Sequence, residues 1–279
     1  MTAPFPGRAA PRLNIGDAVH DGWQAFCRSP RAFVFFAVLL WGLQVFFQLL
    51  QTRIGHSGGL SSRASDWLLA LVGLVGACAS FLWGRISLVR GALRSLEGHR
   101  PSFAELCRWE DGPILRLFWA SLLLGALLVG TALMIFVGVG GGLYILASLA
   151  QARGGTLAPI PDQVIPLLLA LLVALVGLWL VAAIYLKVNQ QFQAQICLSE
   201  QLGPWATLRR GRDLADPHWP LLLLLVSIEA LLCLLGFVAC FVGFFVAWPV
   251  VLCVTTAAYR QLLALESAAP PWPEANPAP

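Results

Sequence analysis

The chain has 279 residues, of which 58% are hydrophobic and only 11% are charged, whereas soluble domains carry about 25% charged residues. Several apolar runs exceed the ~20 residues that a helix needs to cross the hydrocarbon core of a bilayer. This composition excludes an ordinary soluble domain and predicts an all-α, polytopic membrane protein with six transmembrane helices. The net charge of +4 is small, and we expect no nucleic-acid partner.

Both ends of the chain differ from the predicted membrane domain, which covers residues 14–265. Residues 1–13 contain arginines without an apolar stretch behind them, so no cleavable signal peptide is predicted. Residues 266–279 are rich in proline and alanine and lack a helical period. We expect both end segments to be disordered.

Residues 14–28 predict an amphipathic helix. Its apolar residues recur at helical spacing, with Trp23 and Phe26 on one face and polar residues on the other. Asn14 is in position to cap the first turn. Because no soluble core follows, we expect this helix to lie in the membrane surface.

The first predicted hairpin has spans at about 32–50 and 67–89. Gln44, Gln48 and Gln51 recur at helical spacing in the first span. Amides inside a bilayer seek partners on other helices, so this polar stripe serves either helix packing or the lining of a polar cavity. Arg85, near the far end of the second span, is close enough to the surface to extend its charge into water.

The second hairpin is predicted to follow another short surface helix. Ser102 and Glu105 have the spacing of a capping box, Phe103 lies on the apolar face, and the third span covers about 114–137. The glycine-rich residues 138–142 then interrupt the apolar pattern. We expect residues 143–150 to form a re-entrant or interfacial piece; a long tilted helix is the alternative.

The fourth span is predicted at about 164–186, with its helix continuing past the bilayer through the polar residues 187–195. The fifth and sixth spans cover about 221–238 and 244–262 and are joined by a tight turn near Gly243. Proline at position 249 predicts a kink in the sixth helix, which neighbouring helices can tolerate.

The segment at 199–220 is short, basic and bracketed by prolines. Gly203 and Pro204 predict a helix start, and Pro217 and Pro220 predict its end. We expect this helix to lie at headgroup level, where its arginines hold anionic lipid or dock a partner protein. The predicted interfacial contacts in the whole chain are Trp23, Phe26, Phe103, Trp205, Arg209, Arg210, Arg212, His218 and Trp219.

The same order of elements is predicted to occur three times, at about 14–99, 100–201 and 202–265. Each unit has a surface helix, a proline and a hairpin of two spans, a repeat of the scale that builds many membrane folds. With six spans, fifteen basic residues fall on the side of both chain ends and three fall on the other side. The positive-inside rule therefore predicts that both ends and all three surface helices are cytoplasmic.

This layout resembles a group of poorly characterised bacterial six-helix membrane proteins, the YciC-like proteins and the membrane domain of some glycerophosphodiester phosphodiesterases. The resemblance covers about residues 14–265 and implies a protein of the bacterial inner membrane without known catalytic residues. The matching residues are Ile15-Gly16-Asp17 with Trp23 and Phe26, Gly203-Pro204-Trp205 with Ala206 and Leu208, His218-Trp219, and Ala258-Tyr259-Arg260.

The sequence contains no recognisable catalytic or cofactor motif. Seven cysteines and four histidines are scattered without metal-ligand spacing, so we expect no metal, no cofactor and no enzymatic activity. Glu229 lies near the predicted middle of the fifth span, where a charge costs roughly 2.5–3.5 kcal/mol. It is either a functional carboxylate or a protonated one that serves packing. The candidate intramembrane polar residues are Glu229, Arg85, Lys187, Gln44 and Gln48.

The sequence favours a non-enzymatic scaffold or accessory protein that contacts anionic lipid, or a membrane or cytoplasmic protein partner, through its surface helices. The alternative is a transporter or channel for small molecules or ions, with a polar route near Glu229. Transporters usually contain broken helices or several intramembrane charges, and only one deep charge is present here. The oligomeric state stays open.

Overall fold

The computed structural model describes residues 13–52, 64–152, 164–239 and 242–268. All regular secondary structure in these ranges is helical, and six of the helices are long and apolar enough to cross a membrane. The predicted class, an all-α polytopic membrane protein, is confirmed.

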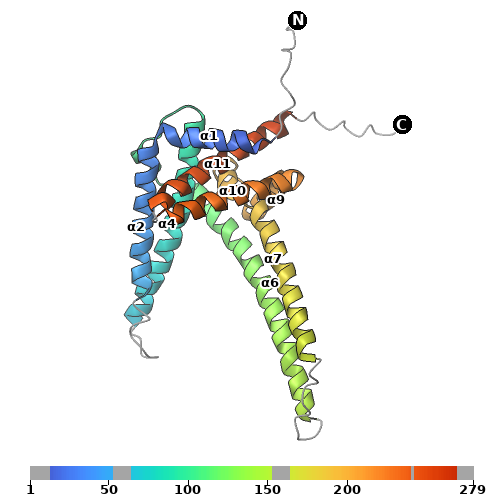
Figure 1. Cartoon of the computed structure of the whole chain (residues 1–279). Helices are drawn as coiled ribbons and strands as arrows, with labels where there is room; N and C mark the ends of the chain where they lie inside the picture. Colours follow the sequence, from blue (N-terminus) through green and yellow to red (C-terminus); the bar gives the residue numbers. More distant parts are fainter. Residues whose placement is uncertain (1–12, 53–63, 153–163, 240–241, 269–279) are drawn as a thin grey trace, which may run out of the picture.

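Two long hairpins descend from one end of the molecule and diverge from each other (Figure 1). The first pairs α2 (Pro30–Gln51) with α4 (Ala64–Leu96), and the second pairs α6 (Asp111–Ala152) with α7 (Val164–Asn189). Glycines let α4 approach α2 closely, since a Cβ at Gly76 would lie 2.2 Å from the ring of Phe47. Small residues on α4 are therefore used for close packing against α2.

The third hairpin, α10 (Trp219–Val238) with α11 (Val242–Ala268), lies across the upper part of the molecule and joins the other two (Figure 1). α11 contacts α1 (Ile15–Arg28), α2 and α4, whereas α10 contacts α7. Pro249 lies inside α11, which continues through it. The third hairpin therefore contacts both diverging hairpins, which also meet directly where α4 contacts α6.

Helix α1 covers the top of this assembly and packs on α11. The side chain of Asn14 caps it by accepting a hydrogen bond from the backbone N–H of Gly16 at 3.0 Å. Gly22 touches the backbone of α11, where an added Cβ would lie 2.6 Å from the Cα of Val254. The buried face of α1 thus contacts protein, and only part of the helix is free for a membrane surface.

The second surface helix is shorter than its neighbours. α5 (Phe103–Leu106) is a single turn. Its predicted capping box is present, with Ser102 Oγ accepting from the Glu105 N–H and Glu105 Oε2 accepting from the Ser102 N–H. α6 then begins at Asp111 and not at residue 114, because Pro113 sits in the first turn, where its missing N–H breaks no helical hydrogen bond.

The predicted re-entrant piece at residues 143–150 is wrong. α6 continues without a break through the glycine-rich residues to Ala152, so the long-helix alternative is the correct one. Glycine lowers helix propensity in water, but a lipid-exposed backbone must satisfy its own hydrogen bonds, and this favours an unbroken helix.

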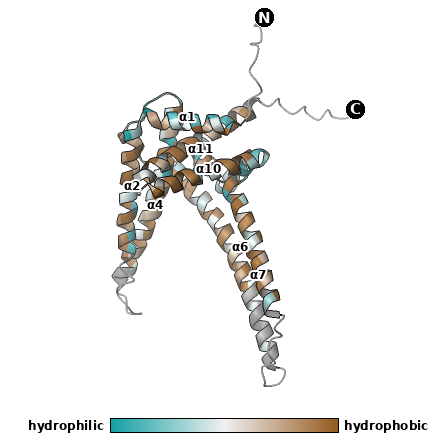
Figure 2. Ribbon diagram, in the orientation of Figure 1, coloured by the Kyte–Doolittle hydropathy of each residue, from teal (hydrophilic) through white to brown (hydrophobic). Residues whose placement is uncertain are grey.

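At the C-terminal end, α11 runs to Ala268, three residues beyond the predicted limit of the membrane domain. The rest of that tail, and residues 1–12, lie outside the described residues. Figure 2 shows apolar residues along the descending parts of α2, α4, α6 and α7, and hydrophilic residues gathered on α1 and near the upper ends of α6 and α7.

Candidate functional site

The clearest departure from the predicted structure lies where α7 ends. The sequence predicts one helix through the polar residues 187–195, but α7 stops at Asn189 and α8 (Gln193–Ser199) starts after a tight turn. Hydrogen bonds from Gln191 N to Val188 O and from Gln193 N to Gln190 O close this turn. Residues 188–190 and 192–197 are buried. The polar run therefore folds into the protein and does not extend into water.

Asp216, in the short 3₁₀ helix η1 (Asp216–His218), fixes the end of α7 against α9 (Pro204–Ala215). Its Oδ1 accepts hydrogen bonds from Tyr185 Oη at 2.5 Å and Asn189 Nδ2 at 3.1 Å. Its Oδ2 accepts from Arg212 Nε at 3.0 Å. One carboxylate thus orients three side chains from two helices.

A second contact holds the turn against α9. Gln190 Nε2 donates to the carbonyl oxygen of Leu208 at 2.9 Å. Gly211 makes this approach possible, because an added Cβ there would lie 2.9 Å from the carbonyl oxygen of Asn189. α9 therefore rests directly on the end of α7.

Two oxygens at this junction lack a partner. Asn189 is 1% exposed and Gln190 is 6% exposed, and neither Asn189 Oδ1 nor Gln190 Oε1 has a hydrogen-bond partner in the part of the chain that is described. Buried polar atoms in native proteins are normally paired, with protein or with another molecule. Gln190 Oε1 lies against α9, 3.1 Å from where a Cβ of Gly211 would be, so it is enclosed by the junction between α7 and α9.

A pocket of about 220 Å³ lies beside these residues, between α6, α7 and α9. Leucine side chains form its apolar walls, and α9 contributes an aromatic and two basic side chains. The lining residues are Leu124, Leu127, Leu186, Asn189, Gln190, Trp205, Leu208, Arg209 and Arg212. We call this the α6–α7–α9 pocket. It combines an apolar interior with a basic side.

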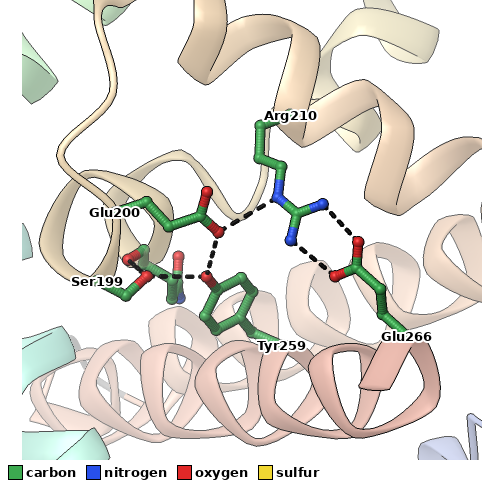
Figure 3. Close-up of polar contacts among 6 residues, drawn as sticks. Ser199, Glu200, Arg210, Tyr259 and Glu266 are labelled. Carbon is green, nitrogen blue, oxygen red and sulfur yellow. Dashed lines mark hydrogen bonds and ion pairs between the residues drawn. The ribbon is translucent and has the colours of Figure 1, made fainter. Parts of the chain in front are cut away.

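The three arginines of α9 have different surroundings. Arg210 is held between two carboxylates, with Nε 3.2 Å from Glu200 Oε1 and a two-pronged contact of 2.6 and 2.7 Å with Glu266 (Figure 3). Arg212 donates through Nε to Asp216. Arg209 is exposed and makes no hydrogen bond or ion pair with another described residue. Arg210, predicted as a lipid or partner contact, is instead committed to protein.

Tyr259 extends the Arg210 cluster into the protein (Figure 3). Its hydroxyl lies 2.9 Å from Ser199 Oγ and 3.5 Å from Glu200 Oε1. The cluster therefore links the end of α8, the start of the α8–α9 connection, α9 and α11. The cluster stabilises the position of α9, the helix that also carries the pocket-lining residues Arg209 and Arg212.

The predicted intramembrane polar residues fall into two places. Glu229 Oε1 accepts a hydrogen bond from Thr255 Oγ1 at 2.7 Å, and Lys187 lies within electrostatic range of both Arg85 and Glu229. No ion pair within 4.0 Å joins these three charges, all of which are described residues. The hydrogen bond therefore joins Glu229 of α10 to Thr255 of α11 within the third hairpin.

The glutamine stripe belongs to the first hairpin. Gln44 Nε2 donates to the carbonyl oxygen of Ala77 at 2.9 Å and to Ser80 Oγ at 3.1 Å, whereas Gln48 is exposed. Of the two roles left open for this stripe, the geometry of Gln44 matches helix packing between α2 and α4.

The remaining predicted interfacial residues also divide. Trp23, Phe103 and Trp205 are exposed. Phe26 is 5% exposed and packs against Phe33 in the core, so its predicted role as a surface contact is wrong. Like Ala25, it lies on the buried face of α1. His218 and Trp219 are half-buried, and the Trp219 ring packs against Tyr185.

The sequence argument missed Asn189, Gln190 and Asp216. A signal for the first two was present, since five amides follow the apolar run within residues 189–195. Amides at a span end are as typical of an exposed helix as of a buried turn, and only the contacts with α9 decide between the two.

Comparison with known protein families, with curated proteins and with solved structures finds no match at the level required for significance. The resemblance to YciC-like proteins therefore stays a prediction, and the function is argued from the site.

Proposed function

We propose that the protein is a non-enzymatic membrane scaffold or accessory protein that binds anionic glycerophospholipid in the α6–α7–α9 pocket. The observation that carries this proposal is the uncommitted Arg209 beside leucine walls. The phosphate group of a lipid pairs with the guanidinium group of an arginine, and the acyl chain of the same lipid packs against neighbouring apolar side chains.

The position of the pocket supports the proposal. Below it, α6 and α7 expose apolar side chains along their length, among them Leu133, Phe136, Leu178 and Leu180. Such a surface requires lipid around it. The change from apolar to hydrophilic residues at the upper end of these helices (Figure 2) is the pattern of a headgroup boundary, where tryptophan and arginine are enriched.

We further propose that this boundary faces the cytoplasm in a bacterial inner membrane, with both chain ends on that side. The excess of basic residues on that side of the predicted topology supports this orientation. The alternative function, transport along a polar route near Glu229, stays a prediction.

The variant Arg209→Gln tests the proposal. Full-length protein in mild detergent is titrated with phosphatidylglycerol and with phosphatidylcholine of the same acyl chains, and bound lipid is counted by native mass spectrometry. We expect the wild type to prefer the anionic lipid and Arg209→Gln to reduce that preference about fivefold, because one arginine near an anionic surface contributes ~1 kcal/mol.

Arg260→Gln is the matched control. Arg260 is exposed on α11, is not among the residues that line the pocket and makes no ion pair with another described residue. It removes the same charge, so its preference should equal that of the wild type. Equal loss in both variants, or no anionic preference in the wild type, contradicts the proposal.

A further inference from the structure

A second pocket, of about 280 Å³, lies between α2, α4 and α11 and shares no residue with the α6–α7–α9 pocket. Most of the side chains that line it are aromatic, and Gln44 and Ser80 supply its polar groups. The aromatic residues are Trp41, Phe81, Phe244 and Trp248. We call this the α2–α4–α11 pocket. It combines flat apolar walls with an amide and a hydroxyl group.

The pocket lies at the level of the hydrocarbon core. Gln44 is ~21 Å along α2 from Pro30 at a rise of about 1.5 Å per residue, in a bilayer core that is ~30 Å thick. On both sides of Gln44 along the helix, α2 exposes large apolar side chains, which are Val38, Leu39, Val45, Phe46 and Leu49. Such a surface requires lipid around it. Acyl chains offer no hydrogen-bond donor to a polar atom at this depth.

The amide of Gln44 is only half used. Its Nε2 donates to the carbonyl oxygen of Ala77 at 2.9 Å and to Ser80 Oγ at 3.1 Å. Ser80 Oγ already donates to the same Ala77 oxygen at 3.0 Å, and rotating the amide by 180° would place its oxygen against that acceptor. The remaining atom is therefore Oε1, which makes no hydrogen bond with another described residue. Unlike Gln190 Oε1, it is not among the closed-off polar atoms of the described residues, so a ligand can reach it.

The pocket also contains unused donors. Neither Trp41 nor Trp248 donates its indole N–H to another described residue; the described tryptophans that do so are Trp109 and Trp179. A hydroxyl group donates one hydrogen bond and accepts others. It therefore pairs with Gln44 Oε1 as a donor and remains free to accept from an indole.

The size and the walls of the pocket restrict the rest of the ligand. An acyl chain covers the aromatic side chains but leaves Gln44 Oε1 unpaired. Pockets for drug-sized ligands measure about 300–1,000 Å³, so 280 Å³ accommodates a single ring and not a fused ring system. Aromatic side chains favour an aromatic partner, because ring pairs gain energy beyond the area that they bury.

We infer that the α2–α4–α11 pocket binds a lipid-soluble aromatic ring that carries a hydroxyl group, as in a phenol or in the reduced form of a quinone. The ring lies among the aromatic side chains, its hydroxyl group donates to Gln44 Oε1, and its apolar tail extends into the bilayer. An oxidised quinone has no donor on its ring and leaves that oxygen unpaired, so the site favours the reduced ring. This inference does not depend on the proposed function, because the two pockets share no residue.

The probes that isolate the hydroxyl group are para-octylphenol and its methyl ether, para-octylanisole. They share ring and tail, and only the phenol has a donor. Full-length protein in mild detergent is immobilised on scintillant beads, and each unlabelled compound displaces tritiated para-octylphenol. We expect the phenol to bind at least about fivefold more tightly than the ether, the ratio that one net hydrogen bond of ~1 kcal/mol gives.

Variants locate the preference. Gln44→Leu removes the acceptor and should bring the ratio between phenol and ether close to one. Gln48→Leu is the matched control, because Gln48 is one turn further along α2, is exposed and is not one of the pocket-lining residues. It should keep the wild-type ratio, and it experiences the same partition of both probes into the detergent. Trp248→Leu removes part of the aromatic wall and should weaken both probes.

The outcomes are distinct. No saturable binding of the phenol, or equal binding of phenol and ether by the wild type, overturns the inference and leaves the lipid proposal untouched. This comparison on the wild type decides the matter even where Gln44→Leu does not fold. A preference for the phenol that survives Gln44→Leu in folded protein, or that Gln48→Leu abolishes equally, also overturns it.

Discussion

Helix α11 of the third hairpin and the two helices of the second hairpin are all apolar, yet they bury very different shares of their residues. The most apolar 18-residue stretch of each span gives the comparison. In the span that contains α11, 61% of the residues in this stretch are buried; the figure is 6% for α6 and zero for α7. Helix α11 is surrounded by α1, α2, α4 and α10. Apolar composition alone therefore does not distinguish a helix that is surrounded by protein from one that is exposed to lipid.

The difference lies in how small and polar residues are distributed. α11 and its partners meet through glycines and hydrogen bonds, such as Gly22 against Val254 and Gln195 Nε2 with Thr256 Oγ1 at 3.3 Å. Glycines of α6 and α7, by contrast, face open space: a Cβ at Gly125, Gly130 or Gly177 would meet nothing within 4 Å. Lipid-facing helices tolerate substitutions that the packed region does not.

The largest expected effect comes from glycine to alanine substitutions that compare these regions directly. Gly22→Ala places a Cβ 2.6 Å from the Val254 backbone, which cannot move aside as a flexible side chain would. We expect a loss of ~3 kcal/mol or more and a fall in apparent Tm on the order of 10 °C in detergent, measured by tryptophan fluorescence.

The paired variant is Gly130→Ala in α6, where no atom lies within 4 Å of the added Cβ. Its apparent Tm should stay equal or rise slightly, because alanine is favoured over glycine in a helix by ~0.5–1 kcal/mol. If Gly130→Ala destabilises the protein as much as Gly22→Ala does, the exposed face of α6 is covered by protein, and the comparison between the two hairpins fails.

A smaller effect is expected where the two regions meet at α9. Arg210→Gln breaks contacts with Glu200 and Glu266 that tie α9 to α11. Because Arg210 and Glu266 are partly exposed, the expected loss is only ~1–2 kcal/mol, or a few degrees in apparent Tm. Arg209→Gln, one residue away, should leave Tm unchanged and reduce the preference for anionic lipid.

The two neighbouring arginines thus separate stability from binding. Arg210→Gln should keep the lipid preference of the wild type in folded protein, and Arg209→Gln should keep its stability. Loss of Tm in both variants would mean that Arg209 also contacts protein, and the pocket would then lack its uncommitted charge.

The class and the six spans were predictable because apolar runs of this length have no other stable environment. Local chemistry also predicted helix starts at Asn14, Ser102 and Pro204, where capping side chains or proline act within one turn. These signals depend on neighbours in the chain, so no tertiary contact was needed to interpret them.

The candidate site was predicted only in part. Trp205, Arg209 and Arg212 were predicted as headgroup-level residues and line the pocket. Arg210 was predicted with them, but it is held by Glu200 and Glu266, which lie 10 and 56 residues away in the chain. Asn189 and Gln190 were assigned to a helix in water because their partner, α9, approaches from another part of the chain. Long-range pairing, not local propensity, decides which polar residue is free.

The smallest expected effect concerns Glu229, which lies between the packed and the lipid-held regions. It accepts a hydrogen bond from Thr255 of α11 and lies within electrostatic range of Lys187 of α7. Glu229→Gln keeps an acceptor at the same position, and Thr255 Oγ1 also donates to Val251 O at 2.8 Å. We therefore expect the free energy of unfolding to change by no more than ~0.5 kcal/mol. The apparent Tm and the lipid preference should stay close to those of the wild type.

This variant also tests the alternative function. Protein reconstituted in liposomes is assayed for proton- or cation-dependent flux, with Gln44→Leu as the comparison, because Gln44 bonds within the first hairpin. A flux that is present in the wild type and abolished by Glu229→Gln, but kept by Gln44→Leu, would assign Glu229 to a transport route. It would also mean that the packed third hairpin, and not the lipid-held one, carries the activity. Unchanged behaviour leaves Glu229 as a packing residue that joins α10 to α11.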